Sequence, residues 1–192
     1  MKKGFTIIEV SILFVIFLIV ACLVAPLSLD NSKQAKFIYK WKVVQQDFSN
    51  IIYSIHSQNL DENFSFKANL EKIIDNETKD KIKDYRIIYL NGSNPSPEYC
   101  FVNYNLTLAN AVIAYKLFEQ PQGELLGILM YDVNGKKGPN QWGKDVFGFN
   151  IYNDRFEPFG KNELVSKQKR DCSKNGTGLF CSNYYLIGGN FD

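Results

Sequence analysis

The stretch GFTIIEVSILFVIFLIVACLVAPLSL, residues 4–29, decides the fold of this 192-residue chain. Beyond Gly4 it is almost entirely apolar, and it is long enough to cross a bilayer, which takes about 20 apolar residues. Its only charged side chain is that of Glu9, which lies inside the apolar run. A carboxylate in such a position is unfavourable unless it is paired, so we expect Glu9 to be a functional residue.

The segment before the apolar run is short and basic and ends in a small residue, Gly4, and no Ala-x-Ala cleavage site closes the run. This arrangement resembles the N-terminal signal of type IV pilins and type II secretion pseudopilins. The resemblance implies that a prepilin peptidase removes a leader of residues 1–4 and leaves Phe5 as an N-methylated N-terminus. It also implies that the Phe5 amine pairs with Glu9 of a neighbouring subunit and that Pro26 kinks the helix.

The resemblance further implies a single-pass protein of the inner membrane whose globular domain lies on the periplasmic side. Its partners would be the lipid bilayer, other pilin or pseudopilin subunits and the inner-membrane assembly machinery. Lysines flank the apolar run on both sides, so the positive-inside rule alone does not give this orientation. A plain single-pass anchor is the alternative, in which Glu9 and the Gly4–Phe5 junction would be coincidences.

Residues 30–60 keep a helical pattern but become amphipathic. Apolar residues recur at three- and four-residue steps and form one stripe: Phe37, Trp41, Val44, Phe48, Ile51 or Ile52, and Ile55. No glycine or proline interrupts the chain after Pro26, which predicts one helix from Phe5 to about Asn59. Its first half, residues 5–29, would lie in lipid or in a filament core, and residues 30–60 would carry the globular domain.

Residues 61–192 are predicted to form this globular region. One or two short helices are expected in residues 61–85. Strands are expected at residues 86–90, 100–105, 111–118, 125–131, 146–152 and near 184–187. The turn at residues 120–123 separates two of these strands as in a hairpin. Short strands after one long helix predict an α+β fold in which an antiparallel sheet covers the apolar stripe; this is also the plan that the resemblance to pilins implies.

The four cysteines differ in their positions. Cys22 lies in the apolar run, Cys100 stands alone, and Cys172 and Cys181 bound a short loop near the C-terminus. We predict a disulfide between Cys172 and Cys181, which would persist outside the cytoplasm and contribute about 2–3 kcal/mol. Reduced or metal-binding thiols are the alternative, although no further Cys or His nearby would complete a zinc site. The loop and the residues after it are similar to the cysteine-bounded loop and final strand of many pilins.

A second informative stretch is YDVNGKKGPNQWGKDVFGF, residues 131–149. Asp132, Asn134, Asn140 and Asp145 place oxygen atoms on a glycine-rich loop, which suits a calcium ion. The spacing is not that of an EF-hand, because the third acidic position and the final glutamate are missing. The alternative is a structural loop whose side chains accept hydrogen bonds from backbone amides. The stretch is also similar to a segment common in pilin-like proteins labelled as type II secretion components.

The charge pattern and the motifs exclude other classes of function. With 22 basic and 20 acidic residues interleaved, the chain lacks the basic field that binding of nucleic acid requires. It carries no G-x-S-x-G, no H-E-x-x-H and no phosphate-loop motif, and only one histidine, His56, so we expect no enzymatic activity. The prediction is a prepilin-like structural subunit of a type II secretion pseudopilus or a type IV pilus. The alternative is a membrane-anchored binding module, calcium-dependent in one version, that does not polymerise.

Overall fold

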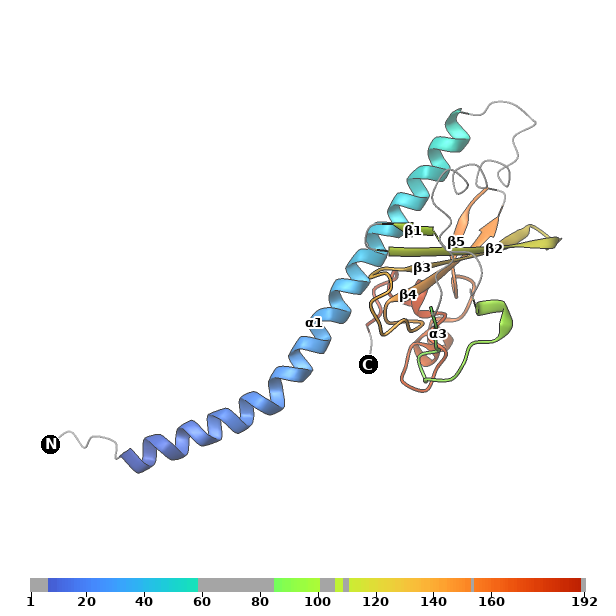
Figure 1. The fold of residues 1–192 in the computed structure, drawn as a ribbon. Coiled ribbons are helices and arrows are strands. Elements are labelled where there is room, and N and C mark those ends of the chain that lie inside the picture. Colours follow the sequence, from blue (N-terminus) through green and yellow to red (C-terminus); the bar gives the residue numbers. More distant parts are fainter. Residues whose placement is uncertain (1–6, 59–84, 101–105, 109–110, 153, 191–192) are drawn as a thin grey trace. The chain divides into compact units, whose positions relative to one another are not determined.

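The computed structural model describes residues 7–58, 85–100, 106–108, 111–152 and 154–190. The chain divides into two compact units, residues 1–36 and residues 37–192, and each is described by itself. One helix, α1 (Ile7–Gln58), belongs to both units (Figure 1). The helix predicted from the sequence, Phe5 to about Asn59, has nearly these bounds.

The first unit contains the N-terminal part of α1. Eight consecutive apolar side chains, from Ile12 to Ile19, are each at least 45% exposed. Within the described ranges, no helix is both long and apolar enough to cross a membrane. The membrane span predicted for residues 5–29 stays a prediction. The helical backbone continues through Pro26, and the kink predicted there stays a prediction too.

The second unit contains one antiparallel sheet whose five strands are neighbours in chain order. The strands are β1 (Leu106–Leu108), β2 (Ala111–Gln122), β3 (Leu125–Asp132), β4 (Val146–Tyr152) and β5 (Phe156–Pro158). The predicted strands at residues 111–118, 125–131 and 146–152 and the hairpin between the first two are confirmed. The turn lies at Gly123 and Glu124 rather than at residues 120–123, because β2 extends to Gln122, which pairs with Leu125. The short strands β1 and β5 were not predicted. The protein is therefore of the α+β class, with an antiparallel sheet.

Side chains alternate between the two faces of the sheet, and both faces are covered. On one face, Leu129 of β3 and Phe149 of β4 belong to a core cluster that includes residues of α1. On the other face, Met130 packs in a second cluster with Tyr85 and Trp142. A sheet buried on both sides explains why its strands read as nearly continuous apolar runs.

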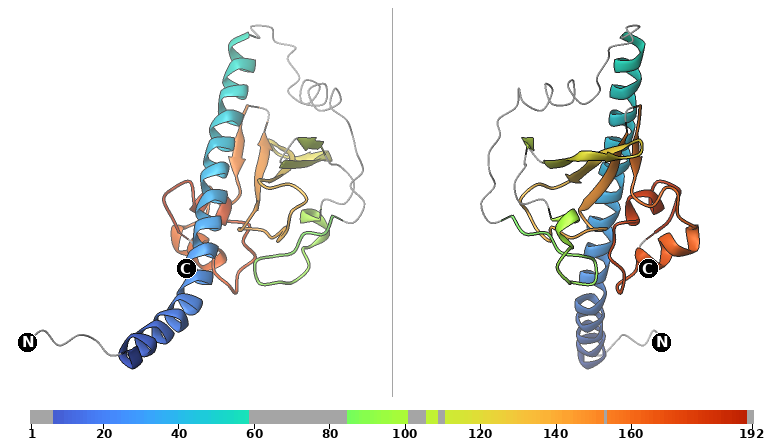
Figure 2. Two further views of the ribbon diagram at one scale, coloured as in Figure 1. Left: turned by 60° about the vertical axis from the view of Figure 1, so that its left-hand side comes forward. Right: turned by 90° about the vertical axis from the view of Figure 1, so that its right-hand side faces the viewer.

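The predicted apolar stripe of α1 packs against the sheet. Trp41 is fully buried, and its ring lies 4.9 Å from that of Phe147 and 4.6 Å from that of Phe149, centroid to centroid. Phe37, Val44 and Phe48 pack against the same cluster. Figure 2 shows this part of the helix running beside the strands. The stripe thus fixes residues 37–48 of α1 to the globular unit.

Three short helices complete the described structure: η1 (Pro97–Tyr99), α3 (Val165–Asp171) and α4 (Cys181–Tyr184). The strand predicted near residues 184–187 is wrong, because the backbone there bonds to itself at helical spacing, from Tyr185 N–H to the Cys181 carbonyl. Residues 86–90 form no strand, and only Ile88 makes an isolated bridge, to Gln141. The elements predicted at residues 61–85 and 100–105 lie almost entirely outside the described residues.

Candidate functional site

The loop between β3 and β4 carries the residues predicted to bind calcium. Asp132, the last residue of β3, is fully buried. One of its oxygens accepts the backbone N–H of Asn134 at 2.9 Å, and the other accepts the hydroxyl of Tyr85. Strand alternation turns the carboxylate toward the face of the sheet where Tyr85 packs. Asp132 therefore fixes the first turn of the loop to a segment 47 residues away.

Asp145 fixes the other end of the same loop. Its carboxylate is also fully buried, and its two oxygens accept the backbone N–H groups of Asn140, at 2.9 Å, and Gln141, at 2.7 Å. Asn140 has a positive φ of 51°, a conformation that asparagine tolerates better than most residues. Gln141 in turn donates its side-chain amide to the carbonyls of Tyr89 and Leu90. The loop is thus held by side chains at both of its ends.

Burial dominates the electrostatics of this loop. It raises the pKa of Asp132 to about 7, with a further contribution from the charge of Asp145 and an opposing one from the Tyr85 hydrogen bond. Burial also raises the pKa of Asp145, against the hydrogen bonds from the backbone N–H groups. The hydroxyl of Tyr85 has a pKa above its usual range, chiefly through burial and then through the nearby Asp132. A cation between the two aspartates would lower the pKa of both.

The loop also contains oxygen atoms suited to a hard cation. The side-chain oxygens of Asn134 and Asn140 are buried and have no hydrogen-bond partner. Together with Asp132 and Asp145 they form the kind of oxygen-only set that calcium prefers, so these residues fit the ion. Every carboxylate oxygen already accepts one hydrogen bond, however, as the structural-loop alternative requires. In the described ranges, no group of three or more His, Cys, Asp or Glu side chains could hold a metal.

The raised pKa of Asp132 predicts how stability depends on pH. Its folded pKa of about 7 exceeds the ordinary 3.8, so between these values the folded state holds a proton that the unfolded state releases. With a calcium chelator present, the free energy of unfolding should fall by about 2–4 kcal/mol as the pH rises from 5 to 8. Urea unfolding at several pH values measures this slope. Asp132→Asn, which cannot ionise, should show a much flatter profile; equal slopes in variant and wild type would contradict the assignment.

Two contacts of the loop could not be predicted from local patterns in the sequence. Lys40 of α1 donates its ammonium to the carbonyl of Val133 at 2.7 Å, and Tyr85 donates to Asp132. These partners lie 93 and 47 positions apart in the chain, beyond the reach of local spacing patterns. The first contact ties the loop to the helix.

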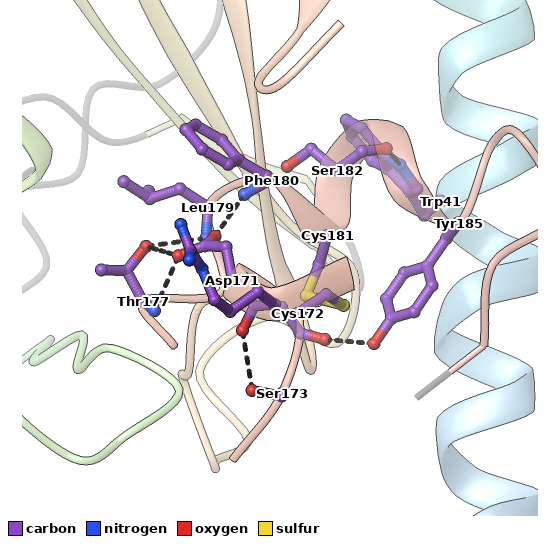
Figure 3. The surroundings of a disulfide bond; sticks show 12 residues. Trp41, Asp171, Cys172, Ser173, Thr177, Leu179, Phe180, Cys181, Ser182 and Tyr185 are labelled. Atoms are coloured by element: carbon purple, nitrogen blue, oxygen red, sulfur yellow. Dashed lines mark hydrogen bonds between the residues drawn. A yellow bond between two sulfur atoms is a disulfide. The ribbon is translucent and has the colours of Figure 1, made fainter. Parts of the chain in front are cut away.

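The predicted disulfide between Cys172 and Cys181 is confirmed, with an S–S distance of 2.09 Å and a Cα–Cα distance of 4.9 Å. Asp171, beside it, organises the loop that the disulfide closes (Figure 3). One of its oxygens accepts the N–H and the hydroxyl of Thr177, at 2.9 and 2.6 Å, and the other accepts the N–H of Phe180 at 2.9 Å. The disulfide and the hydrogen bonds to Asp171 therefore stabilise the same short segment.

The disulfide segment adjoins both α1 and the β3–β4 loop. The indole N–H of Trp41 donates to the carbonyl of Ser182 at 2.7 Å, and the hydroxyl of Tyr185 donates to the carbonyl of Gly143 at 3.0 Å (Figure 3). The Ser182 hydroxyl also accepts the backbone N–H of Gly148, in β4, at 3.0 Å. The two predicted sites, the oxygen-rich loop and the disulfide, are thus neighbours in the fold.

No family model, curated protein or solved structure matches this chain. Of the residues predicted to direct processing and assembly, Gly4 and Phe5 lie outside the described residues. Glu9 lies on the backbone of α1, but its side chain lies outside the described part of the structure. Cys22 is likewise undescribed beyond its helical backbone, whereas Cys100 is an exposed free thiol.

Proposed function

We propose that this chain is a prepilin-like structural subunit of a type II secretion pseudopilus or a type IV pilus. In this proposal the chain is cut after Gly4 and assembles through its N-terminal helix. The observation that carries the proposal is the sequence from Gly4 to Glu9, placed directly before a helix whose residues 12–19 are all exposed. A continuous apolar surface of this kind needs a cover. Lipid would supply it before assembly, and neighbouring helices would supply it afterwards.

The second half of α1 supports another part of the proposed role, which is the attachment of the globular unit to the helix. Trp41 and the rest of the stripe bury themselves against the sheet, and Lys40 binds the β3–β4 loop. Separating this part of the helix from the sheet would expose the fully buried side chain of Trp41. Because residues 37–48 of the helix are packed into the globular unit, this part of the helix and the unit move together, as a filament subunit requires. On this proposal the α+β unit is pilin-like, and the remaining globular surface faces outward from the filament.

The charge of Glu9 gives the first test. In a staggered bundle of these helices, the cationic amine of Phe5 needs a counter-charge, and Glu9 of an adjacent subunit would provide it. Stranding one partner of a buried ion pair costs about 3–5 kcal/mol. We therefore expect Glu9→Ala to enter the membrane normally but to be absent from sheared or purified filaments. Ser11→Ala, two residues further along, is the control and should assemble; filaments of Glu9→Ala at wild-type levels would refute the pairing.

Processing gives an independent test. A small residue is needed beside the cut, so Gly4→Glu should keep its leader. Intact-mass measurement should then find the full-length chain for the variant and a methylated chain starting at Phe5 for the wild type. A mature N-terminus at Phe5 in the variant would argue against a prepilin peptidase.

A second candidate is a membrane-anchored, calcium-dependent binding module that does not polymerise. The unpartnered oxygens of Asn134 and Asn140 beside Asp132 and Asp145 favour it. Calcium there would hold both carboxylates in their charged form and stiffen the loop. At a concentration about 100 times its dissociation constant, calcium should add about 2.7 kcal/mol to the free energy of unfolding.

Thermal melting with and without calcium measures this effect, with magnesium as the control ion. Asp145→Asn should abolish the stabilisation. A wild-type melting temperature that does not change when calcium is added would rule the site out. Calcium binding without any dependence of filament formation on Glu9 would favour the binding module over the filament subunit.

A further inference from the structure

A cavity of about 160 Å³ opens on the face of the sheet opposite α1. It is lined by Tyr99, Asn150, Phe159, Gly160, Lys161, Asn162, Glu163, Leu179 and Phe180. Of these residues, Phe159 and Leu179 are buried, while Tyr99 and Phe180 are half-buried. Segments from η1, β4, the stretch after β5 and the disulfide loop therefore meet at one point.

The volume of this cavity suits a small ligand. An apolar cavity of about 150 Å³ holds one benzene ring, whereas pockets for drug-sized molecules begin at about 300 Å³. The Tyr99 and Phe159 rings, both of which line the cavity, lie 5.5 Å apart at 79° and form an edge-to-face pair. Aromatic faces of this kind pack well against a flat ring. The cavity is therefore the right size for a single ring.

The rim of the cavity selects a neutral, hydrogen-bonding ligand. Its two charged side chains are already compensated, because Lys161 pairs with Glu157 at 3.3 Å and Glu163 pairs with Lys167 at 2.8 Å. An ionic ligand would have to compete with these pairs. The amide of Asn150 offers both donors and an acceptor, which is the combination that a hydroxyl group, itself donor and acceptor, can use.

We propose that this pocket binds one neutral sugar ring, such as the terminal pyranose of a glycan. The C–H face of the pyranose would lie against Tyr99 and Phe159, and its hydroxyl groups would bond to Asn150 and Asn162 at the rim. An aromatic floor with a few convergent polar groups is the usual design of a small-ligand site. The proposal goes beyond the filament role and does not depend on it, since the cavity lies wholly in the globular unit.

Saturation-transfer NMR on the full-length chain tests the proposal. The chain is kept in a zwitterionic detergent without a sugar headgroup, and the probes are the methyl glycosides of glucose, galactose, mannose and N-acetylglucosamine. A site for one ring predicts a dissociation constant on the order of 1 mM for at least one probe. Asn150→Ala and Tyr99→Ala should each weaken binding several-fold. Asn175→Ala, exposed and outside the cavity, is the control and should bind as the wild type does.

Two outcomes would overturn the proposal. One is the absence of transfer to all four glycosides; the other is equal transfer to cyclohexanol, a ring of similar size with a single hydroxyl, which would mark an unspecific apolar pocket. Melting temperatures identify any variant that fails to fold. If Tyr99→Ala does not fold, Asn150→Ala is the deciding variant. Binding of the glycosides by Asn150→Ala as strongly as by the wild type would also refute the site. Filament assembly measured in parallel through Glu9 keeps this result separate from the proposed role as a subunit.

Discussion

Replacing Trp41 with alanine should lower the free energy of unfolding of the globular unit by about 4–6 kcal/mol. The side chain is fully buried between α1 and the sheet, where it stacks on Phe147 and packs against the tilted ring of Phe149. Its removal leaves a cavity that the aromatic neighbours cannot fill, and it leaves the Ser182 carbonyl without its indole donor. Urea unfolding followed by near-ultraviolet circular dichroism measures the loss.

Two further variants separate the contributions to this effect. Trp41→Phe keeps an aromatic ring in the core but loses the hydrogen bond, so an intermediate loss is expected. Tyr39→Ala removes an aromatic residue of the same helix that is 68% exposed, and it should change stability by no more than about 0.5 kcal/mol. If Trp41→Ala behaved like Tyr39→Ala, the packing of the apolar stripe on the sheet would be wrong.

Gly143→Ala should cost about 2–5 kcal/mol through two separate effects. Gly143 has a φ of +79°, which strains any residue with a Cβ atom. A Cβ built there would also lie 2.6 Å from the Sγ of Cys181 and 3.0 Å from the Cα of Gly178. The β3–β4 loop and the disulfide segment would have to move apart. Thermal and urea unfolding both report the loss.

Gly92 provides a matched control for this substitution. Its φ is +82°, nearly that of Gly143, but a Cβ atom there would meet nothing within 4 Å. Gly92→Ala should therefore show the conformational strain alone, about 1–2 kcal/mol. The difference between the two variants is the contribution of the close contact. Equal losses would mean that the loop and the disulfide segment do not press against each other.

The parts of the fold that the sequence predicts well are those decided by periodicity. The stripe through Trp41 and Phe48 and the apolar runs of β2, β3 and β4 are local patterns that the structure confirms. The C-terminal segment shows the limit of this reasoning. Tyr184 and Tyr185 have high β propensity, yet tertiary contacts decide their conformation, since Tyr185 bonds Gly143 and the preceding turn is held by the disulfide.

The candidate calcium site was predicted in part. Asp132, Asn134 and Asp145 share one glycine-rich loop, so their proximity followed from the sequence. The burial of both carboxylates and the bond from Tyr85 did not, because they depend on how a segment 47 residues away packs under the sheet. The cavity proposed to bind a sugar ring is assembled from four separate segments and had no local signature in the sequence.

The hydrogen bond from Trp41 to Ser182 joins residues 141 positions apart. During synthesis, the helix that carries Trp41 leaves the ribosome long before the segment that closes the core around it. The sheet can form strand by strand, since each strand pairs with the next, and β4 supplies Phe147 and Phe149 for the Trp41 ring. The C-terminal turn, which accepts the indole N–H of Trp41, is made after all of these strands. Completion of the core is therefore a late step in biogenesis, and a chain truncated before Ser182 is expected to be recognised by chaperones and proteases.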